Sequence, residues 1–317
     1  MISHCCVIGG TGFIGSHLVE LLVSQSRQVT VIGRSKVPTR SLPNEVRYLA
    51  GNYGDEKLLR EVLRDVDEVI HLAYSTVPKT SFENPIQDIL TNLPASVTLF
   101  DAASRFSIRK LVFVSSGGTV YGKASSLPIT ENHPKNPISP YGITKLTIEN
   151  YATMFHKLKG LPFVCVRPAN AYGERQRPFI DQGFVATAIA SILNGKQVVV
   201  FGDRGTTRDY VHVTDIASGI LAALDLGQTS AFYNLGTGIG KNNMEVLDAI
   251  RPYAESEGYE VRVTKESGRV FDVPVNVLDS SKLRTESQWE PIVTFEDGIR
   301  RTWNWFSHNS LESGTRR

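Results

Sequence analysis

The stretch VIGGTGFIGSHLVELL, Val7–Leu22, decides the fold. It joins a short apolar run, Cys5–Ile8, to an amphipathic run, Phe13–Gln25, and these patterns predict a strand followed by a helix. Three glycines lie between and just inside them: Gly9, Gly12 and Gly15. Glycine allows a tight turn, close approach of a pyrophosphate to the backbone, and close packing of helix on strand. A glycine triplet is also found in turns that bind nothing, but its place between strand and helix favours dinucleotide binding.

Short apolar runs alternate with amphipathic runs along the rest of the chain. Further strands are expected at Gln28–Ile32, Glu68–Ala73, Lys110–Ser115, Phe163–Arg167, Gln197–Phe201, Ala231–Leu235 and Glu260–Thr264. Further helices are expected at Asp55–Arg64, Asn84–Phe106 with a break at Pro94, Pro140–Lys159, Phe184–Leu193, Thr214–Leu224 and Asn243–Glu257. This order predicts an α/β fold, a doubly wound parallel (Rossmann) sheet with a smaller C-terminal substrate lobe. The predicted dinucleotide-binding domain comprises 1–168 and about 209–235, and the lobe comprises 169–208 and about 236–317.

Composition excludes several classes of protein. The 317 residues are 41% hydrophobic, and 34 Lys and Arg against 32 Asp and Glu give a net charge of +2. Disordered, collagen-like and coiled-coil chains differ from this composition, and without a basic run no nucleic acid or membrane partner is expected. The apolar runs are too short to span a membrane, and the N-terminus lacks the features of a signal peptide. A cytoplasmic protein is expected, with Cys5, Cys6 and Cys165 as buried thiols rather than nucleophiles.

The segment SPYGITK, Ser139–Lys145, carries the candidate catalytic pair. Tyr141 and Lys145 are four residues apart at the start of an expected helix, which places them on one face. A cation beside a phenol lowers the phenol's pKa from about 10, so Tyr141 could exchange a proton near neutral pH. The same spacing is common on helix surfaces. Its place after the glycine turn and the SSGG segment (115–118) favours catalysis.

The end of the second strand bears on the choice of dinucleotide. An acid there is typical of NAD sites, and an arginine nearby accommodates the 2′-phosphate of NADP. This chain has Gly33 and Arg34, so NADP is not excluded. Asn52 is a candidate adenine contact, although an asparagine at that place also fits an ordinary turn.

Seven motifs together resemble the NAD-dependent epimerase/dehydratase family of extended short-chain dehydrogenases/reductases, and most of all its nucleotide-sugar 4-epimerases. They are GGTGFIG (9–15), HLA (71–73), VFVSSGGTVYG (112–122), SPYGITK (139–145), VRPANAYG (166–173), VFGDRGTTRDYVHVTD (200–215) and YNLGTG (233–238). The resemblance implies bound NAD, a UDP-sugar substrate and a homodimer formed by the helices Asn84–Phe106 and Pro140–Lys159.

The resemblance also implies roles for individual residues. Tyr141 would be the acid/base, assisted by Lys145 and by a hydroxyl of Ser116 or Thr119. The dinucleotide would contact Gly9, Gly12, Phe13, Ile14, Gly15, Arg34, Asn52, Leu72, Ala73, Asn92, Ser115, Tyr141, Lys145 and Pro168. The substrate would contact Asn170, Val199, Phe201, Arg208, Arg269 and Asp272, the two arginines at the diphosphate. No metal site is expected.

Three departures from the family pattern qualify these roles. Gly117 stands where many members have Ser or Thr, so the hydroxyl that serves the tyrosine stays open among Ser115, Ser116 and Thr119. Strand alternation would place Ser115 and Thr119 on one face with Gly117. Pro168 stands where a bulkier residue often backs the nicotinamide, and Gly118-Thr119 replaces the Asp-Glu pair of dehydratases. The expected activity is C4 epimerisation of a UDP-hexose. The alternatives are an NADPH-dependent keto-sugar reductase and a binding protein without turnover.

Overall fold

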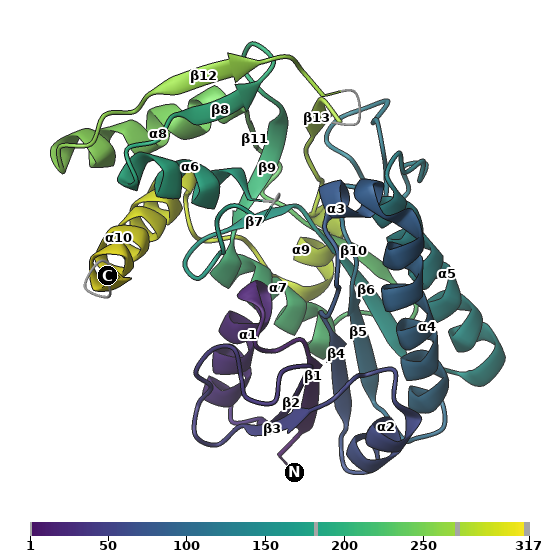
Figure 1. Cartoon of the computed structure of the whole chain (residues 1–317). Coiled ribbons are helices and arrows are strands. Elements are labelled where there is room, and N and C mark those ends of the chain that lie inside the picture. Colours follow the sequence, from purple (N-terminus) through teal and green to yellow (C-terminus); the bar gives the residue numbers. More distant parts are fainter. Residues whose placement is uncertain (1, 181–182, 270–272, 314–317) are drawn as a thin grey trace.

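A seven-stranded, wholly parallel sheet forms the centre of the larger part of the molecule (Figure 1). The computed structural model describes residues 2–180, 183–269 and 273–313. The strand order is β10-β6-β5-β4-β1-β2-β3. The strands are β1 (His4–Ile8), β2 (Gln28–Gly33), β3 (Arg47–Ala50), β4 (Glu68–His71), β5 (Lys110–Val114), β6 (Phe163–Pro168) and β10 (Phe232–Leu235). The order reverses between β1 and β4, as in the doubly wound sheet expected from the sequence.

Helices cover both faces of this sheet (Figure 1). One face packs against α1 (Phe13–Ser24) and α7 (Val213–Asp225), and the other against α2 (Glu56–Leu63), α4 (Pro85–Ala103) and α5 (Pro140–Lys159). The neighbouring residues Cys5 and Cys6 belong to the cores on opposite faces, because side chains alternate along a strand. Cys5, Cys6 and Cys165 are buried free thiols, as predicted, and burial raises the pKa of each.

A smaller lobe with its own core lies beyond the carboxyl edge of the sheet (Figure 1). Its strands are β7 (Asn170–Tyr172), β8 (Val198–Phe201), β9 (Thr207–His212), β11 (Gly240–Lys241), β12 (Val263–Glu266) and β13 (Val275–Asn276). Its helices are α6 (Phe184–Leu193), α8 (Asn243–Ser256) and α10 (Phe295–Ser313), while the short α9 (Ser281–Ser287) packs beside β10. The predicted limits of the two domains stay a prediction.

Two predicted elements need correction. The helix expected to break at Pro94 runs through it as α4, in which Pro94 lies on the exposed side. The strand expected at Glu260–Thr264 lies further along, at β12, where it pairs with β8. Among the described helices, none is both long enough and apolar enough to cross a membrane.

Candidate active site

The glycine-rich turn between β1 and α1 has the form that a pyrophosphate needs. Gly9 has a φ of +89°, and a Cβ at Gly15 would lie 2.3 Å from the Gly9 carbonyl oxygen, so larger residues would not fit at either place. Gly12 caps α1 without a side-chain hydrogen bond. The amides of the first turn of α1 therefore point out of the turn with no capping side chain, as in a dinucleotide-binding cradle.

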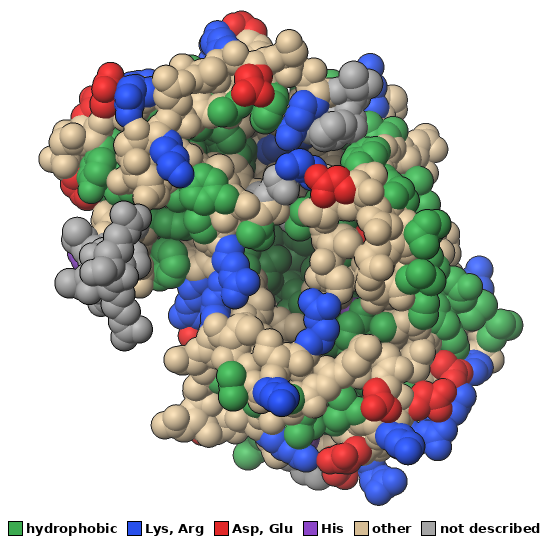
Figure 2. Space-filling model, viewed as in Figure 1, with side chains coloured by type: hydrophobic (Ala, Val, Ile, Leu, Met, Phe, Trp, Pro, Cys, Tyr) green, Lys and Arg blue, Asp and Glu red, His purple; other side chains and the backbone are tan. Residues whose placement is uncertain are grey.

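The carboxyl ends of neighbouring parallel strands surround this turn. Leu72 and Ala73 follow β4, and both donate backbone hydrogen bonds to the Ile8 carbonyl, at 2.9 and 3.0 Å. A Cβ at Gly9 would meet the Ala73 nitrogen at 2.9 Å, so Ala73 lies directly against the turn. Ser115 and Pro168 lie at the ends of β5 and β6. Figure 2 shows the molecule hollowed between its two lobes, with Lys and Arg side chains around the opening and hydrophobic side chains deeper in.

Arg34 follows β2 on the same edge of the sheet. Its guanidinium donates to the Ser75 hydroxyl at 3.3 Å. The ring of Tyr48 covers the preceding Gly33, whose added Cβ would lie 2.6 Å from the Tyr48 hydroxyl. Asn52 accepts a hydrogen bond from the Gly54 amide at 3.0 Å, so its side-chain oxygen stabilises the local turn.

Tyr141 and Lys145 lie on the first turns of α5. Ser139 caps the helix, accepting from the Gly142 amide at 3.1 Å, and Pro140 occupies the first helical position. Lys145 is buried, and its Nζ donates to the Val114 carbonyl at 2.9 Å and lies 5.7 Å from the centre of the Tyr141 ring. The pair predicted from the sequence therefore meets at the end of β5.

Burial changes the protonation chemistry expected of this pair. It raises the pKa of Tyr141, the Asp88 carboxylate raises it further, and a hydrogen bond with Ser116 acts in the opposite direction. Burial also lowers the pKa of Lys145, to about 7. The expectation that the phenol's pKa is lowered toward neutrality is wrong for the protein by itself, because desolvation and the Asp88 carboxylate raise it.

The segment after β5 is a turn and not a continuation of the strand, which corrects one expectation. Alternation along a strand does not apply to Ser115–Thr119, because β5 ends at Val114. Of the three candidate hydroxyls, that of Ser116 acts to lower the pKa of Tyr141, while those of Ser115 and Thr119 are buried with no hydrogen-bond partner.

The lack of a side chain at Gly117 leaves no free space in the site. A Cβ there would lie 2.4 Å from the Leu278 side chain and 2.8 Å from the Arg167 carbonyl, so the position has no room for any side chain. Gly118 is the open position. A Cβ there would meet only the Asn170 side-chain oxygen, at 3.5 Å, and the Ser116 hydroxyl, at 3.9 Å.

Sequence reasoning missed three side chains beside the catalytic pair. The Tyr74 ring lies 4.8 Å from that of Tyr141, edge to face, and 4.1 Å from Lys145 Nζ. The buried Asp88 accepts hydrogen bonds from the Tyr74 and Thr144 hydroxyls, at 3.3 and 2.6 Å. A signal was present in the sequence, because Asp88, Asn92 and Ser96 form a polar stripe at helical spacing in α4.

Asn92 uses its amide within the protein. The side-chain oxygen accepts from the Ser75 amide at 2.8 Å, and the nitrogen donates to the Asp88 carbonyl at 2.8 Å. It therefore ties α4 to the segment that follows β4. A direct contact with a dinucleotide stays a prediction.

The predicted substrate residues come from several segments of the smaller lobe. Asn170 starts β7 and lies beside Gly118. Val199 and Phe201 lie on β8, and the Arg269 guanidinium stacks 4.2 Å from the centre of the Phe201 ring. Arg208 on β9 donates to the Thr207 and Val273 carbonyls, at 2.9 and 2.7 Å. Asp272 lies outside the described residues.

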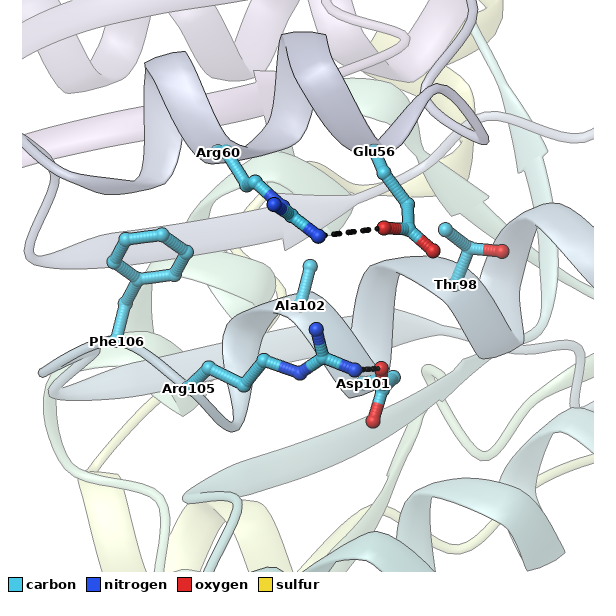
Figure 3. Close-up of a pocket in the computed structure, with 7 residues that line it drawn as sticks. All are labelled: Glu56, Arg60, Thr98, Asp101, Ala102, Arg105 and Phe106. Carbon is cyan, nitrogen blue, oxygen red and sulfur yellow. Dashed lines mark hydrogen bonds and ion pairs between the residues drawn. The ribbon is translucent and has the colours of Figure 1, made fainter.

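A separate hollow between α2 and α4 is not part of this site (Figure 3). It is lined by Glu56, Arg60, Thr98, Asp101, Ala102, Arg105 and Phe106. Its charges are paired with one another, Arg60 with Glu56 and Arg105 with Asp101 (Figure 3). None of these residues belongs to the glycine turn or the catalytic segments.

Comparison with known proteins agrees with this geometry. The model of the NAD dependent epimerase/dehydratase family matches residues 5–236. A putative UDP-glucose 4-epimerase of Methanocaldococcus jannaschii is 32% identical over 306 residues, which are 96% of this chain and 98% of that protein.

Two solved structures are similar over nearly the whole chain. The UDP-glucose 4-epimerase of Thermotoga maritima with UDP-glucose is 32% identical, with a TM-score of 0.91 over 97% of this chain and 99% of that one. The UDP-glucose 4-epimerase of Thermus thermophilus in complex with NAD is 34% identical, with a TM-score of 0.88 over 96% and 99%. The chain thus belongs to the NAD-dependent epimerase/dehydratase family, whose cofactor is NAD.

Proposed function

We propose that this protein interconverts a UDP-hexose and its C4 epimer through a transient 4-keto sugar, with NAD held throughout the cycle. The observation that carries the proposal is the Tyr141–Lys145 pair, with Lys145 Nζ 5.7 Å from the centre of the Tyr141 ring and bonded to the Val114 carbonyl at the end of β5. The near-full-length similarity to UDP-glucose 4-epimerases supports the substrate class.

The residues of the turn would hold the cofactor. The amides at the start of α1 would bind the pyrophosphate, Ala73 lies against the turn, and Lys145, bonded to the end of β5, would hold the nicotinamide ribose. Bound there, NAD would supply a reversible acceptor for the C4 hydride.

The chain's own groups move the proton. Tyr141 accepts the proton of the 4-hydroxyl in the first half of the cycle and returns it to the 4-oxygen in the second. Lys145 and Ser116 favour the phenolate, the first by its charge and the second by its hydroxyl, which acts to lower the pKa of Tyr141. Both contributions oppose burial, which favours the neutral phenol.

Residues of the smaller lobe would bind the substrate. Arg208 and Arg269 would hold the diphosphate, and Phe201 with Val199 would pack against the base. The open space at Gly118, next to Asn170, would let the keto sugar turn so that either face of C4 meets the cofactor.

Loss of water from the sugar is disfavoured. Gly118 and Thr119 stand where a dehydratase has its acidic pair, so the segment after β5 brings no carboxyl group to protonate a leaving hydroxyl.

We also propose a homodimer formed through α4 and α5. These helices lie side by side on the outer surface, and Figure 2 shows hydrophobic side chains on the side of the molecule where Figure 1 places them. Leu90 on α4 is 62% exposed and Ile143 on α5 is 53% exposed. A contiguous exposed apolar surface of this kind favours association with a second copy.

Interconversion of sugars tests the proposal. The purified protein, given no added cofactor, should convert one or more of UDP-glucose, UDP-N-acetylglucosamine and UDP-glucuronate to its C4 epimer. Nucleotide released on denaturation should be NAD. Failure with all three sugars, or turnover only with added NADPH, would replace the proposal by the reductase.

A further inference from the structure

The buried face of α4 carries one charged residue directly behind the catalytic pair. Asp88, Asn92 and Ser96 lie four residues apart, and each is fully buried. Asn92 is bonded to the backbone, and Ser96 bonds the His71 ring at 3.0 Å. Asp88 is the only carboxylate of the stripe.

Hydroxyl groups surround the Asp88 carboxylate. Thr144 on α5 donates to one oxygen at 2.6 Å, and Tyr74 and Thr76, from the segment after β4, donate to the other. Among the described residues, Asp88 has no ion pair. Hydroxyls solvate a charge without neutralising it, and a buried charge without a counter-charge is costly, so a cation is required nearby.

Lys145 is the cation in that position. Its Nζ lies 4.1 Å from the centre of the Tyr74 ring, whose hydroxyl bonds Asp88. The Tyr74 ring therefore contacts both charged groups, the carboxylate through its hydroxyl and the ammonium over its ring, and it also packs edge to face against Tyr141. The other carboxylate near Lys145 is Glu149, and it is already paired with Arg167, through two bonds of 3.0 and 2.6 Å.

We propose that Asp88 is a positioning residue of the catalytic pair, which supplies the counter-charge of Lys145 and, through the Tyr74 hydroxyl, fixes the Tyr74 ring against Lys145 and Tyr141. The expected effect of Asp88 on turnover rests on the proposed function, whereas its expected effect on the pKa of Lys145 does not.

The groups that face Lys145 decide the direction of the pH effect. His71 and Tyr74 face it from the β4 side. Tyr141 and Glu149 face it from α5, and Cys165 faces it from β6. On the neighbouring α3 (Pro78–Glu83), Lys79 and Glu83 are exposed. Burial holds the pKa of His71 at about 3, and burial raises the pKa of Cys165, so both are neutral near pH 7.

Asp88 and Glu149 are then the negative charges that oppose the effect of desolvation on the pKa of Lys145. Burial lowers the pKa of Lys145 to about 7, and these carboxylates act to raise it. Asp88 also raises the pKa of Tyr141. Removing the Asp88 charge lowers the pKa of both groups.

The direct test is a titration of Lys145 in Asp88→Asn. With lysine labelled at Cε and the signal assigned through Lys145→Arg, NMR should show the midpoint of Lys145 move to lower pH by roughly one unit. The control is Asp101→Asn, the same substitution near the other end of α4 at a partly exposed carboxylate that pairs with Arg105 and Lys159, which should leave the midpoint in place. An unchanged midpoint in folded Asp88→Asn would overturn the proposal.

The second readout is the pH profile of turnover. The pKa values of Tyr141 and Lys145 together set its two limbs, and loss of the Asp88 charge lowers both values, so both limbs should move to lower pH in Asp88→Asn. A loss of rate with both limbs unmoved would mean a structural role only, and would also overturn the proposal. If the Lys145 midpoint moves but no sugar is epimerised by the unmodified protein, the proposed function fails and the role of Asp88 stands.

A second pair of variants, which keep Asp88, tests the proposal independently of whether Asp88→Asn folds. Tyr74→Leu removes the ring from the ammonium, and the Lys145 midpoint should fall. Tyr74→Phe keeps the ring and should leave the midpoint closer to the original value. Equal midpoints in Tyr74→Leu and the unmodified protein would contradict the proposed effect of the Tyr74 ring on Lys145.

Discussion

At the scale of single residues, the account depends first on the Tyr141 phenol. Tyr141→Phe should lower turnover by about 10²–10⁴-fold, because it removes the group that carries the proton. Binding of NADH, followed by fluorescence, should persist. Lys145→Ala should impair both turnover and binding, since Lys145 is proposed to contact the cofactor.

Tyr151→Phe is the matched control for this variant. Tyr151 lies further along the same helix, and its removal should leave turnover near normal. Unchanged turnover in Tyr141→Phe would contradict the mechanism.

The two glycines after β5 should respond differently to the same change. Gly117→Leu forces a side chain into Leu278 and the Arg167 backbone, so it should destabilise the fold by about 1–3 kcal/mol or more. Gly118→Leu enters open space beside Asn170, so it should lower epimerisation more than nucleotide binding while keeping Tm. Thermal unfolding and turnover, measured on both variants, separate the two effects. A Gly118→Leu enzyme with normal turnover would show that the sugar does not use this space.

At the scale of elements, the end of β2 decides between the two dinucleotides. We expect NAD to bind better than NADP, because an epimerase must regain its own hydride and gains from a cofactor that stays bound. Arg34 lies on the cofactor edge, so Arg34→Ala should weaken residual NADP binding about tenfold and leave NAD binding nearly unchanged.

The exposed Lys36 of the same loop provides the control for this experiment. Lys36→Ala should change neither affinity much. A much higher affinity for NADP than for NAD, lost in Arg34→Ala, would support the reductase instead.

The elements that the sequence predicts well are those whose pattern is local. The glycine turn, α1 and α5 are specified by short motifs with caps and periodic apolar residues. Pro94 misleads because its effect depends on which side of α4 meets solvent. The helix α10 was missed although Ile299, Trp303 and Phe306 follow helical spacing, because charged and polar residues surround them.

At the scale of the whole molecule, the smaller lobe could not be assembled from the sequence. Its strands β7, β11 and β13 have only two or three residues, too few to show a period of two. The meeting of Asp88, Tyr74 and Thr144 depends on the packing of α4 against α5 and the segment after β4, and no local pattern contains that packing.

Association of two copies is the prediction at this scale. Leu90→Arg places a charge in the apolar face of α4 and α5, so it should convert a dimer to a monomer in sedimentation equilibrium. Ile292→Arg, at an exposed apolar residue outside this face, should leave the dimer intact. An unmodified protein that sediments as a monomer would contradict the proposed interface.

The fate of the hydrogen at C4 tests the central claim most directly. A UDP-hexose deuterated at C4 should give its epimer with the deuterium still at C4, in ordinary water and without added cofactor, because the hydride leaves and returns within one site. Mass spectrometry and NMR of the product locate the label. Loss of the label from C4, or product formation that depends on added NADPH, would contradict the account.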